Sequence, residues 1–194
     1  MRTSQLLTAV LLTSLISISR AESAVDTNTL YANPKSLVLG YLWADGSGSG
    51  EKWHFRNRNK AITDRFAAAA HVCGCEVIRR VNKDFHAAQI SGVVFDMPLD
   101  RLPFDLAQAS DAEIKSFCAA VIEGEGNHDG LVLDDPDRKH AEAMAAALGR
   151  LHLKTRLEGT KFFRLYAEKE CWPVIQSFPF VAYGRVPGGK RGGK

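Results

Sequence analysis

Two nine-residue segments, 80 positions apart, share one pattern and constrain the fold more than any other feature of this sequence. They are Val38-Leu-Gly-Tyr-Leu-Trp-Ala-Asp-Gly46 and Cys118-Ala-Ala-Val-Ile-Glu-Gly-Glu-Gly126. Each belongs to an apolar run of helical length with small residues three or four apart, and each ends in an acid followed by glycine, where a helix C-cap is expected. A segment repeated at this distance predicts two copies of one structural unit.

The segments that follow each motif are also similar. In the first half we expect a helix starting at Pro34, a mobile turn at 46–50, a strand at 51–58, a helix at 59–73, and a strand pair at 75–81 and 85–94. In the second half we expect a helix opened by a capping box at Ser110, a strand at 130–133, a helix at 136–151, a hairpin of 153–157 with 161–167, and a helix at 169–178. The order predicts an α+β fold made of two equivalent halves.

These halves give the chain of 194 residues five expected regions. They are a leader at 1–30, a first repeat at 31–94, a linker at 95–109, a second repeat at 110–183 and a basic flexible tail at 184–194. The leader fits a secretory signal, an organellar transit peptide or a plain extension, and composition does not decide among them. No apolar run reaches the roughly 18 residues of a membrane span, so we expect no stable membrane association.

Charge is divided unevenly along the chain, although the net charge is only +3. Residues 50–83 hold eight Lys/Arg against three Asp/Glu, and residues 150–170 hold six against three. Residues 93–137 hold two against eleven. Two basic blocks around an acidic middle predict two equivalent surfaces that meet an anionic partner.

With its two motifs and the matching elements after them, the sequence resembles the LAGLIDADG homing endonucleases in their single-chain, two-repeat form, over roughly residues 34–180. The resemblance implies two pseudo-symmetric αββαββα repeats with saddle-shaped antiparallel sheets and the motif helices packed at the repeat interface. It also implies that Asp45 and Glu125 are the metal-binding catalytic carboxylates. The first copy departs from the family pattern, because Trp43 stands where the motif usually has an earlier acid and the second copy keeps Glu123.

The spacing of small residues supports the same helix pairing on physical grounds. Gly40 and Ala44 are four apart on the first helix, as are Ala120 and Gly124 on the second. Small residues at this spacing let two helices approach closely, and parallel packing would bring Asp45 and Glu125 together at the helix C-termini. Two carboxylates at the negative ends of helix dipoles favour a divalent cation, with Mg²⁺ or Mn²⁺ as the expected metal.

The basic side chains of the strands are the candidate DNA contacts, because in the family the strands of both repeats lie along the major groove. A two-stranded ribbon fits that groove, and Lys/Arg there contact phosphates or guanine edges. The candidates are Lys52, His54, Arg56, Arg58, Arg79, Arg80 and Lys83 from the first repeat, and Lys154, Arg156, Lys161 and Arg164 from the second.

The resulting hypothesis is a monomeric, divalent-metal-dependent, site-specific double-strand DNA endonuclease, located either inside the cell at DNA or in an organelle. The main alternative is an intron-splicing maturase, with intron RNA as partner, or a DNA- or RNA-binding protein on the same fold that does not cleave. A secreted or periplasmic protein with an accidental resemblance is a third reading. Motifs for nucleotide loops, dinucleotide binding and Ser or Cys nucleophiles do not occur.

Several other residues have two interpretations. His71, Cys73 and Cys75 suggest a zinc site, but cysteines near a helix end are commonly structural. His128 and Asp129 either assist catalysis or make local turn contacts, and Lys161 or Lys169 is a candidate basic catalytic group. We expect Glu123 to be a helix-end side chain and not a second metal ligand.

Overall fold

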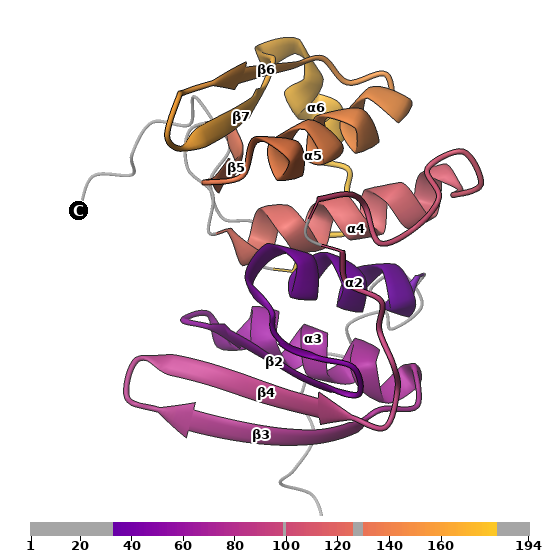
Figure 1. The fold of residues 1–194 in the computed structure, drawn as a ribbon, viewed down its shortest axis with the longest axis vertical. Helices are drawn as coiled ribbons and strands as arrows, with labels where there is room; N and C mark the ends of the chain where they lie inside the picture. The colour runs from indigo at the N-terminus through magenta and orange to yellow at the C-terminus, as the bar shows by residue number, and fades with distance from the viewer. Residues whose placement is uncertain (1–32, 99, 126–129, 182–194) are drawn as a thin grey trace, which may run out of the picture.

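The computed structural model describes residues 33–98, 100–125 and 130–181. It shows two α+β units stacked along the long axis of the molecule, with helices α2 and α4 next to each other between them (Figure 1). The predicted leader and basic tail, and the predicted roles of Gly126, His128 and Asp129, lie outside the described residues. The α+β architecture with antiparallel sheets is confirmed.

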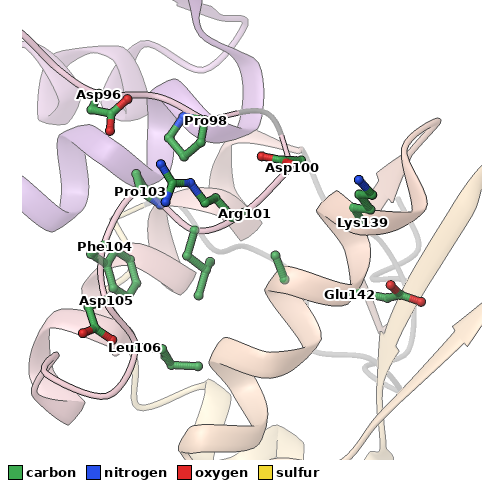
Figure 2. A pocket seen from close by; sticks show the side chains of 12 residues that line it. Asp96, Pro98, Asp100, Arg101, Pro103, Phe104, Asp105, Leu106, Lys139 and Glu142 are labelled. Carbon is green, nitrogen blue, oxygen red and sulfur yellow. The ribbon is translucent and has the colours of Figure 1, made fainter.

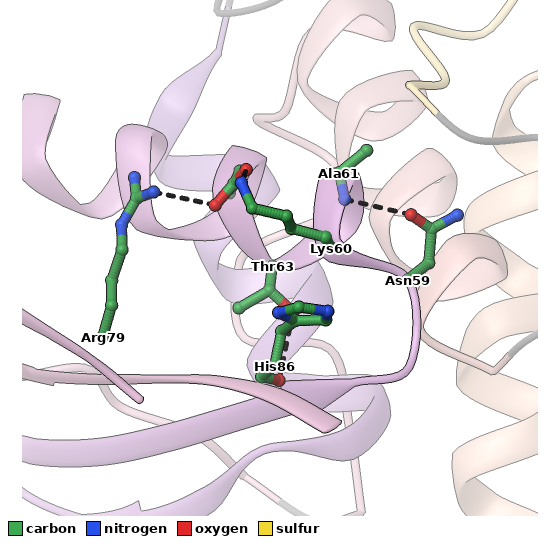
Figure 3. Close-up of polar contacts among 7 residues, drawn as sticks. Asn59, Lys60, Ala61, Thr63, Arg79 and His86 are labelled. Carbon is green, nitrogen blue, oxygen red and sulfur yellow. Dashed lines mark hydrogen bonds and ion pairs between the residues drawn. The ribbon is translucent and has the colours of Figure 1, made fainter. Parts of the chain in front are cut away.

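The first unit contains α2 (Pro34–Asp45), β1 (Ser47–Ser49), β2 (Lys52–Asn57), α3 (Lys60–Val72), β3 (Glu76–Asn82) and β4 (Phe85–Ser91). Proline in the first turn of α2 fits the missing N–H of that position, and Asn59 caps α3 by accepting the Ala61 N–H (3.0 Å) (Figure 3). The predicted mobile turn at 46–50 was wrong in part, because β1 forms there and pairs with β2. The predicted strand at 85–94 stops at Ser91, where Gly92 has a φ of 89°.

These strands form one antiparallel sheet in the order β1-β2-β4-β3, with α3 packed on one face. Trp53 lies opposite Ile90 and Phe55 opposite Ala88, and all four are buried on the face toward the helices. The alternate positions of the same strands lie on the other face, which we call the first open face. The predicted period-2 pattern of β2 is therefore confirmed, with Lys52, His54 and Arg56 exposed.

The second unit contains α4 (Asp111–Gly124), β5 (Leu131–Asp135), α5 (Arg138–Arg150), β6 (Thr155–Glu158) and β7 (Phe163–Ala167), in a sheet of order β5-β7-β6. Ser110 and Glu113 form the predicted capping box at the start of α4. The predicted helix start at Pro136 was two residues early, because Asp137 is the N-cap of α5. The predicted helix at 169–178 is shorter, a 3₁₀ turn (Lys169–Cys171) followed by α6 (Trp172–Ile175).

The two units meet through α2 and α4, whose small residues lie in contact. A Cβ added to Gly40 would lie 2.8 Å from the Ala120 Cβ, and one added to Gly124 would lie 2.8 Å from the Ala44 Cβ. These pairings also run in the same direction along both helices, so α2 and α4 are parallel. The close parallel packing predicted from residue spacing is confirmed, and it fixes where the two helix C-termini lie.

No helix in the described part of the chain combines the length and apolar character that crossing a membrane requires.

Candidate active site and nucleic-acid interface

Asp45 and Glu125 are brought to one place by the parallel helix pair. Asp45 is the last residue of α2, and Glu125 is the C-cap of α4, with its N–H donating to the Val121 carbonyl (3.0 Å). Ala44 and Gly124 lie in contact, so Asp45 and Glu125, the next residues of the two parallel chains, follow side by side. The charge of Asp45 accordingly raises the pKa of Glu125. The carboxylates therefore lie near each other at the interface of the two units, as the sequence predicts.

The environment of Glu125 strongly opposes its ionisation. Burial is the largest cause, followed by the negative charges of Asp135, Asp45 and Asp134, and together they raise its pKa to about 8. A hydrogen bond from the Asp134 backbone N–H acts in the other direction. Burial also raises the pKa of Asp45, and the charge of Arg56 opposes that rise. A cation near these carboxylates would remove much of the cost of ionising them.

The donor set fits a divalent cation that keeps water ligands. All the acidic groups are oxygen donors, and the buried Oδ1 of Asp134 accepts no hydrogen bond within the described residues. Among those residues no three His, Cys, Asp or Glu side chains converge as a preformed metal cluster. The residues that would hold a metal are therefore Asp45 and Glu125, with water and substrate oxygens completing the coordination, as Mg²⁺ commonly requires.

Arg56 is a basic residue near the carboxylates whose position the sequence did not indicate. It extends from β2 on the first open face, and its charge lowers the pKa of Asp45. Lys161 and Lys169, the two basic groups considered from the sequence, are exposed and do not contribute to the pKa shift of Asp45 or Glu125. The chain leaves Asp45 along β1 and comes back antiparallel along β2, with Ser47 opposite His54. This pairing brings Arg56 back toward Asp45.

Glu123 lies in the last turn of α4, as the sequence predicts, and it is buried at the unit interface with 3% of its surface exposed. Its Oε2 accepts from Arg65 Nη1 of α3 (3.2 Å) and from the Tyr41 hydroxyl of α2, and its Oε1 accepts from the Val181 N–H. The carboxylate from the second unit thus joins both helices of the first. Burial, followed by the charge of Glu123, raises the pKa of Tyr41 well above its ordinary value.

Trp43 occupies the equivalent position in the first motif and makes the reciprocal contact. Its ring lies 3.4 Å (centroid to centroid) from that of His140 on α5, and its Nε1 donates to the Arg101 carbonyl of the linker (3.2 Å). His140 is buried, and its Nδ1 lies 2.6 Å from an Asp135 oxygen. Each motif helix therefore inserts one large side chain against the second helix of the opposite unit. Trp43 therefore packs at the interface of the two units.

The structure places the first-repeat basic residues on two different faces. Lys52, His54, Arg56 and Arg80 are exposed on the first open face, where Arg80 and Arg56 both lie opposite Ala87. Arg58 follows β2 and, like Arg56, has its guanidinium over the Phe85 ring (5.4 and 5.6 Å). Lys83 lies in the β3–β4 turn with a φ of 40°.

Arg79 lies apart from this group. It pairs in register with buried Ala88, so it faces the helix layer, and its Nη1 donates to Asp64 of α3 (2.7 Å) (Figure 3). The sequence did not distinguish it from Arg80 because β3 is an edge strand with polar and apolar residues on both faces.

The second-repeat basic residues are exposed, but two of them are paired with acids. Arg156 pairs with Glu158 on β6 and lies over the Tyr166 ring (5.3 Å), and Arg164 Nε donates to Asp134 of β5 (3.2 Å). Lys154 and Lys161 are exposed beside this sheet.

The alternative zinc ligands do not form a site within the described residues. Cys75 is buried, Cys73 is half-buried and His71 is exposed, and no three-residue metal cluster forms there. Burial raises the pKa of both thiols, which disfavours the thiolates that zinc requires.

A hollow of about 790 Å³ lies between the linker and α5 (Figure 2), and none of the predicted site residues lines it. Its lining includes Asp96, Asp100, Asp105 and Glu142 against Arg101 and Lys139. With four acids against two bases, this hollow does not suit a polyanion.

Comparisons with known proteins identify the fold. The structure is similar to that of mesophilic variants of the homing endonuclease I-DmoI, with a TM-score of 0.56 and 10% identity over 78% of this chain and 99% of that one. I-DmoI in complex with DNA and Ca gives a TM-score of 0.56 and 9% identity over 77% and 91%. The N-terminal LAGLIDADG domain of DUF199/WhiA gives a TM-score of 0.50 and 10% identity over 87% and 98%.

No protein-family model matches the sequence, and the search of curated proteins gave no match. The chain has the LAGLIDADG fold, with the two motif helices at the interface of its units. Because the same fold occurs in a homing endonuclease and in WhiA, the activity must be argued from the site.

Proposed function

We propose that this protein is a divalent-metal-dependent endonuclease that cuts double-stranded DNA at a specific site as a monomer. The observation that carries the proposal is the pair Asp45 and Glu125. Each comes from one motif, and they interact at the C-termini of parallel helices in an environment that raises the pKa of Glu125 to about 8. Ionising these two acids is costly in the absence of a positive charge. Their presence at this position therefore favours a function in which a cation binds them.

Asp45 and Glu125 would hold Mg²⁺ or Mn²⁺ between the two units. When bound, such a metal activates water, orients the scissile phosphate and stabilises the leaving 3′ oxygen. Arg56 would bind a phosphate close to Asp45, and the effect of its charge on the pKa of Asp45 supports this role. The DNA would lie across the open faces of the two sheets, with base edges within reach of side chains on β2 and β6.

The test is cleavage of a pooled randomised DNA library, or host genomic DNA, with Mg²⁺. The wild type is compared with an Asp45→Asn/Glu125→Gln double variant and with a control double variant, Asp100→Asn/Glu170→Gln. The control makes the same charge change at two exposed positions outside the motif helices. We expect metal-dependent cuts with a 5′ phosphate and 3′ hydroxyl from the wild type and the control, and none from the site variant.

The alternative is a maturase or a DNA- or RNA-binding regulator on the same fold. The occurrence of this fold in WhiA, together with the absence of a preformed three-ligand metal cluster in the described part, favours keeping it in the test. Retained, salt-sensitive binding of nucleic acid without cleavage by any of the three proteins would support this alternative. Cleavage that persists in the site variant would contradict the assignment of Asp45 and Glu125.

A further inference from the structure

The open faces of the two sheets differ in the charge they present, although they occupy equivalent places in the two units. On the first open face Lys52, Arg56 and Arg80 stand on β2 and β3, together with His54 and the single acid Glu76. None of these basic side chains forms an ion pair with a carboxylate among the described residues. They are therefore available to an external anion.

The second open face is the face of the β5-β7-β6 sheet that carries Arg156 and Arg164, opposite the face of buried Leu165. Each of these two strand arginines already has an acidic partner. The register sets Asp134 of β5 opposite Arg164 of β7, and Arg164 opposite Glu158 of β6. Arg164 therefore lies in a row between two acids. Arg164 is ion-paired with Asp134, and Arg156 with Glu158. The two arginines and the two carboxylates of these ion pairs together carry no net charge.

This difference has a direct consequence for binding DNA. A basic side chain that neutralises a phosphate displaces condensed counterions. The binding constant therefore falls as salt rises, and each such contact adds about 0.9 to the steepness of log K against log [salt], which we call the salt slope. An arginine that must first leave a carboxylate gains less from a phosphate, and the released carboxylate repels the DNA.

We propose that the two units attach to DNA unequally, a proposal that rests on the proposed function. The first open face supplies most of the electrostatic attachment to its half of the DNA site. The strand arginines of the second open face contribute little, because Glu158 and Asp134 neutralise them. The acids on the second face are therefore determinants of affinity, and Glu158 weakens the binding of the half-site beneath β6.

The first experiment compares matched losses of charge. Binding of the full chain to a labelled 40-base-pair duplex of random sequence is measured by fluorescence anisotropy between 50 and 300 mM KCl with EDTA present. We expect Lys52→Gln/Arg80→Gln to lower the salt slope by about 1.8, two phosphate contacts. We expect Arg156→Gln/Arg164→Gln to lower it by less than about 0.5. All four side chains are exposed, so the variants should fold.

The second experiment predicts a gain. Glu158→Gln frees Arg156 on the second open face, and we expect the slope to rise by about 0.9 and binding at 100 mM KCl to tighten by about threefold to tenfold. The control is Glu142→Gln, which breaks an exposed ion pair with Arg138 on α5 and changes the net charge equally, but on the helix layer. We expect the control to leave the slope unchanged.

The outcomes separate this inference from the function on which it rests. Equal losses from the two double variants, or equal gains from Glu158→Gln and Glu142→Gln, overturn the unequal attachment and leave DNA binding in place. If the wild type does not bind the duplex at 50 mM KCl, both the unequal attachment and the proposed function are wrong.

Discussion

Glu125 lies where burial and three other carboxylates all oppose its negative charge, at the C-terminal end of a helix whose dipole adds to that opposition. Asp134 contributes in two ways, because its charge opposes ionisation while its N–H stabilises the ionised form. At the residue scale, the protonation of Glu125 and the binding of a cation are therefore two competing ways of lowering the same electrostatic free energy.

We expect the metal-free protein to lose stability as pH rises from about 5 to about 8. In the unfolded chain Glu125 ionises near its ordinary pKa, whereas the folded state keeps it protonated until about pH 8, so the folded state is penalised progressively over this window. Melting temperatures measured by scanning fluorimetry across this range, with EDTA or with Mg²⁺, provide the measurement. Mg²⁺ should raise the melting temperature more at pH 8 than at pH 5.

The control for this experiment is Glu125→Gln, which cannot ionise. We expect its melting temperature to depend less on pH and to respond less to Mg²⁺. A wild-type melting temperature that rises between pH 5 and pH 8 in EDTA, in excess of that variant, would show that Glu125 is ionised in the metal-free fold.

At the scale of elements, the contact between α2 and α4 depends on the absence of side-chain atoms. A Cβ at Gly40 would also meet the backbone carbonyl oxygen of Phe117 at 2.5 Å, and backbone moves less readily than a side chain. The helices therefore hold their separation through glycine and alanine, and this separation sets the distance between Asp45 and Glu125.

Gly40→Ala should destabilise the protein by about 1–3 kcal/mol, although alanine favours helices, because the added methyl group overpacks the interface. The control is Gly149→Ala on α5, where a Cβ meets no atom within 4 Å, and it should stabilise by about 0.5–1 kcal/mol. Urea denaturation of both variants measures the difference. Equal effects of the two substitutions would show that the helices separate without cost.

The contacts between units across this interface also depend on Glu123. Glu123→Gln leaves the Arg65 guanidinium buried beside a neutral amide, and we expect a loss of about 3–5 kcal/mol in the free energy of unfolding. Glu142→Gln breaks an exposed pair on α5 and should cost no more than about 0.5 kcal/mol. The same denaturation experiment compares them, and similar small losses would mean that the buried pair is replaceable.

At the scale of the whole molecule, the faces of the first sheet determine which basic residues would meet DNA in the proposed complex. Arg79 and Arg80 are neighbours in sequence but lie on opposite sides of β3, one toward α3 and Asp64, the other on the first open face. Charge counted along the sequence treats them alike, whereas the fold separates them.

We expect Arg80→Gln to weaken binding of a random-sequence DNA duplex about threefold at 100 mM KCl and to lower the salt slope by about 0.9, the value for one phosphate contact. Arg79→Gln removes the same charge from the helix side and should change neither quantity appreciably. Anisotropy titrations at several salt concentrations test this. If Arg79→Gln weakens binding as much as Arg80→Gln, net charge decides the affinity and the position of the arginine does not.

Much of the fold could be predicted from the sequence because its determinants are local. Small residues four apart predicted the helix pair, and β2 alternated cleanly because one face is buried. Other features depend on distant partners. Glu123 meets Arg65 from 58 positions away, and β1 consists of glycine and serine, which have no strand preference. The approach of Arg56 to Asp45 depends on strand register, which no local pattern specifies.

The different large side chains at Trp43 and Glu123 limit how the two units can pair. If two copies of the second unit came together, Glu123 would meet a helix like α5, which supplies His140 where α3 supplies Arg65. If two copies of the first unit came together, Trp43 would meet α3 and leave the Arg65 guanidinium buried without its carboxylate. The two halves are thus complementary to each other, and a chain divided in the linker should reassemble as a heterodimer in preference to either homodimer.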